Sequence, residues 1–172
     1  MFESIAEKKL WLWYAIAVLV IIFDQITKQM ASSSLDYNQP MAITNFFNFT
    51  LRHNTGAAFS LFHDAGGWQR WFFGILAAVF SVFIAVWITR IDRKHWLEAL
   101  GLALVLGGAL GNLYDRILLG YVVDFIHFHY RDVYHFPAFN VADSAISCGA
   151  GLLIIDILFF KSDHKSTENK SA

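Results

Sequence analysis

The stretch LEALGLALVLGGALGNLYDRILL, residues 97–119, decides the fold class of this chain. Roughly 20 mainly apolar residues cross the hydrocarbon core of a bilayer as a helix, and this stretch is long enough to do so. Gly107 and Gly111 are small residues one helical turn apart, which permits close contact with another helix. Polar side chains gather toward the end of the stretch, at Asn112, Asp115 and Arg116. The stretch therefore predicts a membrane-spanning helix with one polar end.

Three further stretches have similar length and apolarity. The predicted spans cover approximately residues 10–30, 71–89, 97–119 and 142–160. The whole chain is 56% hydrophobic and only 16% charged, with a mean hydropathy of +0.45. We therefore predict an all-α membrane protein with a single domain over 1–160 and a polar cytoplasmic tail over 161–172. A secretory signal peptide is the alternative for the first span, but it should not carry Asp24 and Lys28 one helical turn apart.

Basic residues are distributed unevenly between the two sides of the predicted bundle. Eight of them would lie on one side: Lys8, Lys9, Arg90, Arg93, Lys94, Lys161, Lys165 and Lys170. The other side would hold Arg52, Arg70 and Arg131, with Lys28 and Arg116 at span ends. Because cytoplasmic loops carry an excess of lysine and arginine, this asymmetry predicts that both termini are cytoplasmic. The loops 31–70 and 120–141 should then face outward.

The outer loops should contain structure of their own. Ile43–Leu51 is rich in aromatic and β-branched residues and suits a short strand, and the turn signal Asn54-Thr55-Gly56 follows it. A small extracytoplasmic β-element is therefore predicted. The aromatic segment Val122–Tyr134 suits an amphipathic stretch that lies along the membrane interface.

Composition excludes several classes of function. The net charge of −1 argues against a nucleic-acid partner, and a single cysteine excludes an intramolecular disulfide. That cysteine, Cys148, lies in an apolar run and is predicted to be a buried, inert thiol. The sequence contains no phosphate loop, no dinucleotide fingerprint and no nucleophile elbow.

Charged and amide side chains from separate spans should meet at the outer membrane boundary, because the spans run alternately outward and inward. The residues that fall at this depth are Asp24, Lys28, Asn112, Asp115, Arg116, Asp124, Asn140 and Asp143. Local explanations stay open for several of them. Asp24 and Lys28 suit an intrahelical ion pair, and Arg116 could extend to the lipid headgroups. Asn140 and Asp143 suit a helix N-cap and a helix-dipole partner. Asp156, at the inner end, is expected to be solvated or interfacial.

Asp124 and Asp143 are the candidate reactive pair. Two neighbouring carboxylates cannot both ionise cheaply, so they can share one proton and activate a water for hydrolysis. A metal site formed with His127, His129 and His135 is less favoured, because the histidine spacing fits no common zinc pattern. No metal and no cofactor are therefore predicted. A small transporter or channel component is the alternative, since buried charges also line translocation paths.

Five motifs carry a resemblance to a known family. They are Asp24-Gln-Ile-Thr-Lys28, Asn54-Thr-Gly-Ala-Ala-Phe59, Gly111-Asn-Leu-Tyr-Asp-Arg116, Val123-Asp124-Phe125 and Phe139-Asn-Val-Ala-Asp143. In this order and spacing, the chain closely resembles the bacterial lipoprotein signal peptidases, also called type II or prolipoprotein signal peptidases. The resemblance implies four helices, an outward-facing β-cradle and a periplasmic interfacial helix.

The same resemblance implies an activity and roles for the site residues. The chain would be an aspartic endopeptidase of the bacterial cytoplasmic (inner) membrane, with Asp124 and Asp143 as its catalytic dyad at the periplasmic face. Its substrates would be diacylglyceryl-modified prolipoproteins, cleaved just before the lipidated cysteine, and membrane lipids would surround it. Substrate-positioning or supporting roles would fall to Asp24, Lys28, Asn54, Gly56, Asn112, Asp115, Arg116 and Asn140.

Overall fold

Four long helices form the body of the protein. The computed structural model describes residues 2–56, 67–92, 94–130 and 133–160. The helices are α1 Phe2–Ser34, α2 Trp68–Ile88, α3 Trp96–Leu118 and α4 Val141–Phe159. Each contains a segment that is long and apolar enough to cross a membrane, in α1 the segment Leu10–Ser34. The four predicted spans are thus confirmed, with bounds that differ by a few residues.

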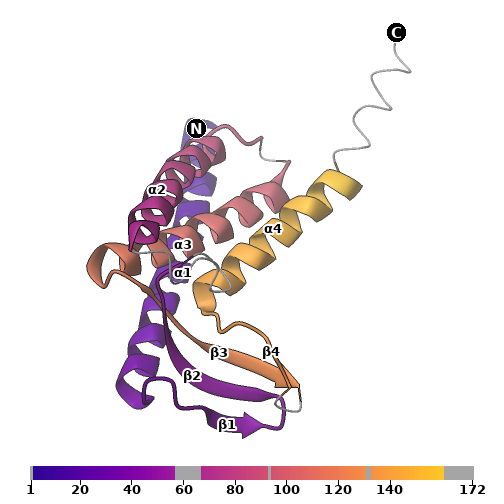
Figure 1. Cartoon of the computed structure of the whole chain (residues 1–172). Helices are drawn as coiled ribbons and strands as arrows, with labels where there is room; N and C mark the ends of the chain where they lie inside the picture. Colours follow the sequence, from indigo (N-terminus) through magenta and orange to yellow (C-terminus); the bar gives the residue numbers. More distant parts are fainter. Residues whose placement is uncertain (1, 57–66, 93, 131–132, 161–172) are drawn as a thin grey trace.

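Helix α3 lies at the centre of the bundle and packs against the other three helices (Figure 1). Buried side chains of α1, α2 and α3 form the apolar core, with Ala17, Ile84, Ile88, Leu102 and Leu106 at its centre. By contrast, many large apolar side chains of α1, α2 and α4 are exposed, as expected for helices whose outer faces contact lipid. The position of α3 explains why the polar residues at its end can be buried.

Glycines let α3 approach its neighbours closely. A Cβ added at Gly149 of α4 would lie only 2.5 Å from the Gly101 carbonyl oxygen of α3. A Cβ added at Gly107 would lie 2.7 Å from the Ala17 carbonyl oxygen of α1. Because no side chain intervenes at these points, the backbones pack directly against each other. These contacts fix the register of α3 against α1 and α4, and with it the position of each polar residue of α3.

The segments between α1 and α2 and between α3 and α4 form one antiparallel sheet in the order β1-β2-β3-β4. Its strands are β1 Met41–Thr44, β2 Phe47–Asn54, β3 Val122–Tyr130 and β4 Tyr134–His135. The predicted β-element is confirmed, but Ile43–Leu51 is not one strand: a turn at Asn45 and Phe46 divides it into a hairpin. Figure 1 shows the sheet at one end of the bundle.

The segment Val122–Tyr134 differs from its predicted form. Instead of an amphipathic stretch along the interface, it provides the long central strand β3 and the start of β4. Its backbone groups pair with β2 on one side and β4 on the other, which an isolated interfacial segment could not offer them. The described residues form no helix beyond these four, so the interfacial helix implied by the resemblance has no counterpart among them.

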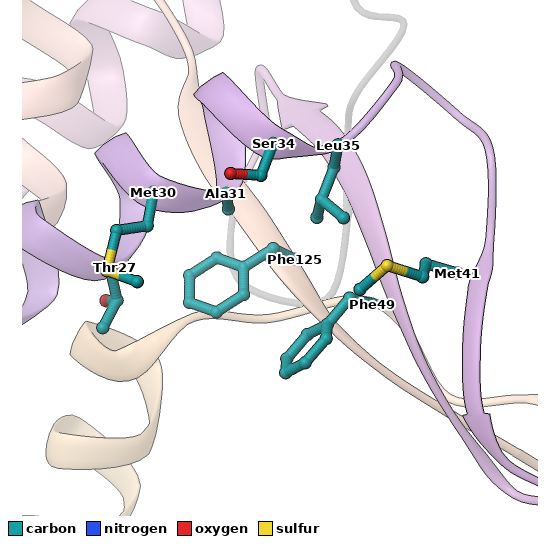
Figure 2. A pocket seen from close by; sticks show the side chains of 8 residues that line it. All are labelled: Thr27, Met30, Ala31, Ser34, Leu35, Met41, Phe49 and Phe125. Atoms are coloured by element: carbon teal, nitrogen blue, oxygen red, sulfur yellow. The ribbon is translucent and has the colours of Figure 1, made fainter.

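An apolar pocket of about 300 Å³ lies between the last turns of α1 and the sheet (Figure 2). Its lining includes Met30 and Leu35 of the α1 end and Phe49 and Phe125 of the central strands. Consecutive strand residues point to opposite faces, so the neighbouring Asp124 is turned away from Phe125. The apolar pocket is therefore separate from the polar site described below.

Two expectations for α4 are wrong. Asp156 is only 3% exposed, because the last turns of α4 pack against the start of α3. Cys148, predicted to be buried, is exposed. The next residue, Gly149, faces α3. Because consecutive helical residues point about 100° apart, Cys148 is directed away from α3.

Candidate active site

Lys28 connects two buried carboxylates from different helices. Its Nζ lies 2.8 Å from Asp24 Oδ2 on α1 and 2.9 Å from Asp115 Oδ2 on α3. The exposed fractions of Lys28, Asp24 and Asp115 are 3%, 0% and 2%. Lys28 Nζ also donates a hydrogen bond of 2.8 Å to Asn112 Oδ1. The pair Asp24–Lys28 is therefore part of an interhelical network, not only the intrahelical pair that the sequence also allowed.

Gln25 belongs to this network, although it is not among the residues predicted for the site. Its Nε2 donates to Asp115 Oδ1 at 2.8 Å and to the Gly111 carbonyl oxygen at 3.3 Å. The signal was present, because positions 25 and 28 are three apart and share a helix face. Gln25 thus adds a second polar link between α1 and α3.

The start of α4 is held by a side chain of α1 and by its own capping residues. Asp24 Oδ1 accepts a hydrogen bond of 2.9 Å from the backbone N–H of Ala142 in the first turn of α4. Asn140 is the N-cap, and its Oδ1 accepts from the Asp143 backbone N–H at 2.9 Å. Asp143 completes a capping box, because its Oδ2 accepts from the Asn140 backbone N–H at 3.3 Å. The carboxylate of Asp143 is therefore fixed at a helix N-terminus, as the sequence suggested.

Asp124 lies on β3, is 1% exposed and accepts hydrogen bonds from two amides. Asn140 Nδ2 donates to its Oδ1 at 2.7 Å, and Asn54 Nδ2 at the end of β2 donates to its Oδ2 at 3.0 Å. Asn140 therefore both caps α4 and contacts the strand carboxylate. The sheet and the bundle meet at this residue.

Asn112 joins the two candidate aspartates to the buried lysine. Its Nδ2 donates to Asp143 Oδ1 at 2.8 Å, while its Oδ1 accepts from Lys28 Nζ and, at 3.2 Å, from Asn140 Nδ2. The amide orientation follows, because a lysine ammonium can only donate. A continuous chain of hydrogen bonds therefore runs from Lys28 through Asn112 and Asn140 to both carboxylates.

The electrostatics of Asp124 reflect its burial and its neighbour. Burial, and to a lesser extent the nearby negative charge of Asp143, raise the pKa of the Asp124 carboxyl to about 7. Hydrogen bonds from Asn54 and Asn140 oppose these two effects only in part. Near neutral pH, a substantial fraction of the Asp124 carboxyl groups therefore carries a proton.

Arg116 and Gly56 contact each other beside the site. Arg116 Nη2 donates to the Gly56 carbonyl oxygen at 2.9 Å, and Nη1 donates to the Asn112 carbonyl oxygen at 3.3 Å. The side chain is buried and points inward, so it does not extend to headgroups. The Gly56 backbone N–H donates to Asn54 Oδ1 at 3.0 Å, which orients the Asn54 amide toward Asp124. Ala57, Ala58 and Phe59 of the same motif lie outside the described residues.

The rings of His127, His129 and His135 contact one another on the sheet. The ring of His127 stacks on that of His135 with centroids 5.3 Å apart, and His129 stacks on His135 at 5.8 Å. His127 Nδ1 lies 3.4 Å from Thr50 Oγ1. The two aspartates are instead held by amides, an arrangement suited to sharing a proton and positioning a water.

Comparison with known proteins identifies the family. A model of the family "signal peptidase (SPase) II" matches residues 16–159, most of the chain. The chain belongs to the signal peptidase II family. It is therefore a membrane peptidase, which decides against the transporter alternative.

Individual relatives agree with the signal peptidase II assignment. A lipoprotein signal peptidase of Teredinibacter turnerae is 65% identical over 147 residues, which cover 86% of this chain and 87% of the relative. One of Acinetobacter baumannii is 53% identical over 150 residues, covering 87% of this chain and 85% of the relative.

Two solved bacterial membrane enzymes share the fold of this signal peptidase II chain. Both are 33% identical to it, with TM-scores of 0.77 and 0.73. The first match covers 88% of this chain and 90% of the solved one, and the second covers 87% and 94%. The arrangement of four helices and a small sheet is thus that of known membrane enzymes.

Proposed function

We propose that this peptidase removes the signal peptide from diacylglyceryl-modified prolipoproteins, cutting just before the lipidated cysteine, with Asp124 and Asp143 as its catalytic pair. One observation carries the proposal. A buried carboxyl with a pKa of about 7 on β3 and a half-buried carboxyl at the start of α4 are joined through hydrogen bonds to asparagines, among which Asn140 contacts both. The relatives named lipoprotein signal peptidases support the choice of substrate.

The pair can hydrolyse a peptide bond without a covalent intermediate. Ionised Asp143 takes a proton from a water whose oxygen attacks the scissile carbonyl carbon, while protonated Asp124 donates a hydrogen bond to the carbonyl oxygen. The C–N bond of the tetrahedral intermediate then breaks, and Asp143 delivers its proton to the leaving amine. Asn112, Asn140 and Asn54 hold the two carboxylates in place for these transfers.

We further propose that the site lies at the periplasmic face of the bacterial cytoplasmic membrane, with both termini in the cytoplasm. The excess of lysine and arginine at the predicted inner ends supports this orientation. The two acyl chains of a lipidated cysteine stay in the bilayer, so its peptide bond lies near the headgroups. In Figure 1 the sheet joins the bundle where α1 and α3 end and α4 begins. This is the end that the distribution of basic residues assigns to the periplasmic face.

The purified protein should cleave a precursor peptide only when its cysteine carries the diacylglyceryl group. The lipid would anchor the peptide at the depth of the aspartates, whereas the unmodified peptide is the matched control. Mass spectrometry of the products should show a single cut before the cysteine. Absence of cleavage, or equal cleavage of both peptides, would contradict the proposed substrate.

Turnover should decrease as the pH rises through about 7. Protonated Asp124 is the hydrogen-bond donor, and the fraction that holds the proton falls above its pKa. The value of kcat/KM should therefore drop about tenfold per pH unit on the alkaline side. His127 is the control, because burial lowers its pKa below the usual range and His127→Gln should leave the alkaline limb in place. A profile that stays flat through pH 7 to 9 would exclude Asp124 as the donor.

A further inference from the structure

Three potential metal ligands meet at the end of the bundle opposite the aspartates. His95 is the N-cap residue of α3, Glu98 lies in its first turn, and Asp156 lies in the last turn of α4. One ligand atom of each side chain lies within 4.8 Å of the others. In Figure 1 the start of α3 and the end of α4 both lie at the end of the bundle away from the sheet. This cluster, here called the inner cluster, plays no part in the proposed hydrolysis.

The close contact between α3 and α4 brings these residues together. Gly101 and Gly149 pack backbone against backbone, which places the start of α3 beside the end of α4. Glu98 lies about one turn before Gly101, and Asp156 about two turns after Gly149, on the antiparallel partner. The meeting of two carboxylates therefore follows from the same glycines that pack the helices.

The inner cluster contains a buried oxygen without a partner. Asp156 is 3% exposed, and its Oδ2 has no hydrogen-bond partner among the residues that the structure describes. An unsatisfied buried carboxylate oxygen is costly, so natural proteins rarely leave one without a ligand, a water or a proton. Asp156 and His95 both line a pocket of about 170 Å³. The open oxygen thus has room beside it for a ligand.

A cation satisfies the inner cluster better than a shared proton does. A proton shared by Glu98 and Asp156 through the buried Oδ2 would appear as a hydrogen bond between the acids, yet this oxygen makes none within the described part of the chain. Lys94 lines the same pocket, but its side chain is exposed and forms no ion pair with Asp156 among the described residues. An imidazole beside two carboxylates is a ligand set for borderline divalent metals. It would offer one nitrogen and two anionic oxygens.

We propose that His95, Glu98 and Asp156 bind a divalent cation of the zinc type, which joins the first turn of α3 to the last turn of α4. Zinc bonds of about 2.0–2.1 Å place tetrahedral ligand atoms roughly 3.3 Å apart. Side-chain rotations that bring the three atoms from within 4.8 Å to that spacing complete the site. Water from the pocket takes the fourth position. The cation is structural and lies away from the aspartates, so the inference does not depend on the proposed function.

Zinc binding to the full-length protein tests the inner cluster directly. The protein, without a histidine tag and freed of metal in detergent, is titrated with zinc chloride against a chromophoric chelator. One zinc per chain is expected, and Asp156→Asn and Glu98→Gln should each weaken the affinity at least about tenfold. Cobalt is a second probe, since its visible absorption should report nitrogen and oxygen ligands in the wild type and disappear in His95→Gln.

Two controls make the result specific. Asp92→Asn removes an exposed carboxylate just before α3 and should leave zinc affinity unchanged. His135→Gln alters the histidine group on the sheet and should also have no effect. If Asp156→Asn does not fold, His95→Gln at a half-exposed position still decides the question. Zinc binding that is absent, or equal in the wild type and in the His95, Glu98 and Asp156 variants, would overturn the proposal.

Discussion

Replacing Asp124 with asparagine should lower turnover of the lipidated precursor by at least about 10³-fold. The amide has nearly the shape of the carboxyl but cannot transfer a proton to or from the reacting groups. Its neighbours Asn54 and Asn140 donate hydrogen bonds to the carboxyl oxygens, so the amide also places an NH₂ against one donor. Asp143→Asn should have an effect of similar size, because the two residues act as one unit.

Folding controls separate lost chemistry from lost structure. Both variants should elute as the wild type in size-exclusion chromatography and keep its helical circular dichroism. Asp36→Asn is the matched substitution, since Asp36 is an exposed aspartate between α1 and β1. It should retain full turnover. Substantial activity in either folded dyad variant would refute the assignment of Asp124 and Asp143.

Replacing Lys28 with methionine should destabilise the protein by about 3–5 kcal/mol. Methionine fills a similar volume but leaves Asp24 and Asp115 as buried carboxylates without their shared cation. The substitution also removes a hydrogen bond to Asn112, which holds Asp143. Unfolding in detergent, followed by circular dichroism, should show the loss of stability. Turnover should fall with it.

A second substitution distinguishes the buried charge from the lost packing. Lys28→Met combined with Asp24→Asn removes one of the two uncompensated charges and should recover part of the stability. Arg90→Met, at an exposed cation after α2, should change the free energy of unfolding by less than about 1 kcal/mol. A loss no larger for Lys28→Met than for Arg90→Met would contradict the role of the lysine.

Sequence patterns predicted the helices well because a bilayer imposes strict rules. Apolar length alone located all four spans, and alternation of direction along the chain brought Asp24, Asn112 and Asp143 to one depth. The five motifs then named the family. What the sequence could not supply was which atoms of this group touch, since hydrogen bonds such as Asp24 to Ala142 join positions far apart in the chain.

The sheet and the inner cluster were harder to predict, for different physical reasons. The first four residues of β3 are all buried, so the strand lacks the regular alternation of buried and exposed side chains that marks a strand in a sequence. The burial of Asp156 depends on the register between α3 and α4, which the glycine contacts set. Neither pairing partner nor helix register is visible in the composition of a single segment.

The hydrogen bond from the Ala142 backbone to Asp24 has a consequence for timing. It joins the first helix to the last, and Asp143 follows Ala142 directly in the chain. A nascent chain with three helices inserted therefore lacks Asp143, one member of the proposed catalytic pair, and the Asn140 cap that orients it. We expect activity only after the fourth helix has been synthesised and has packed into the bundle.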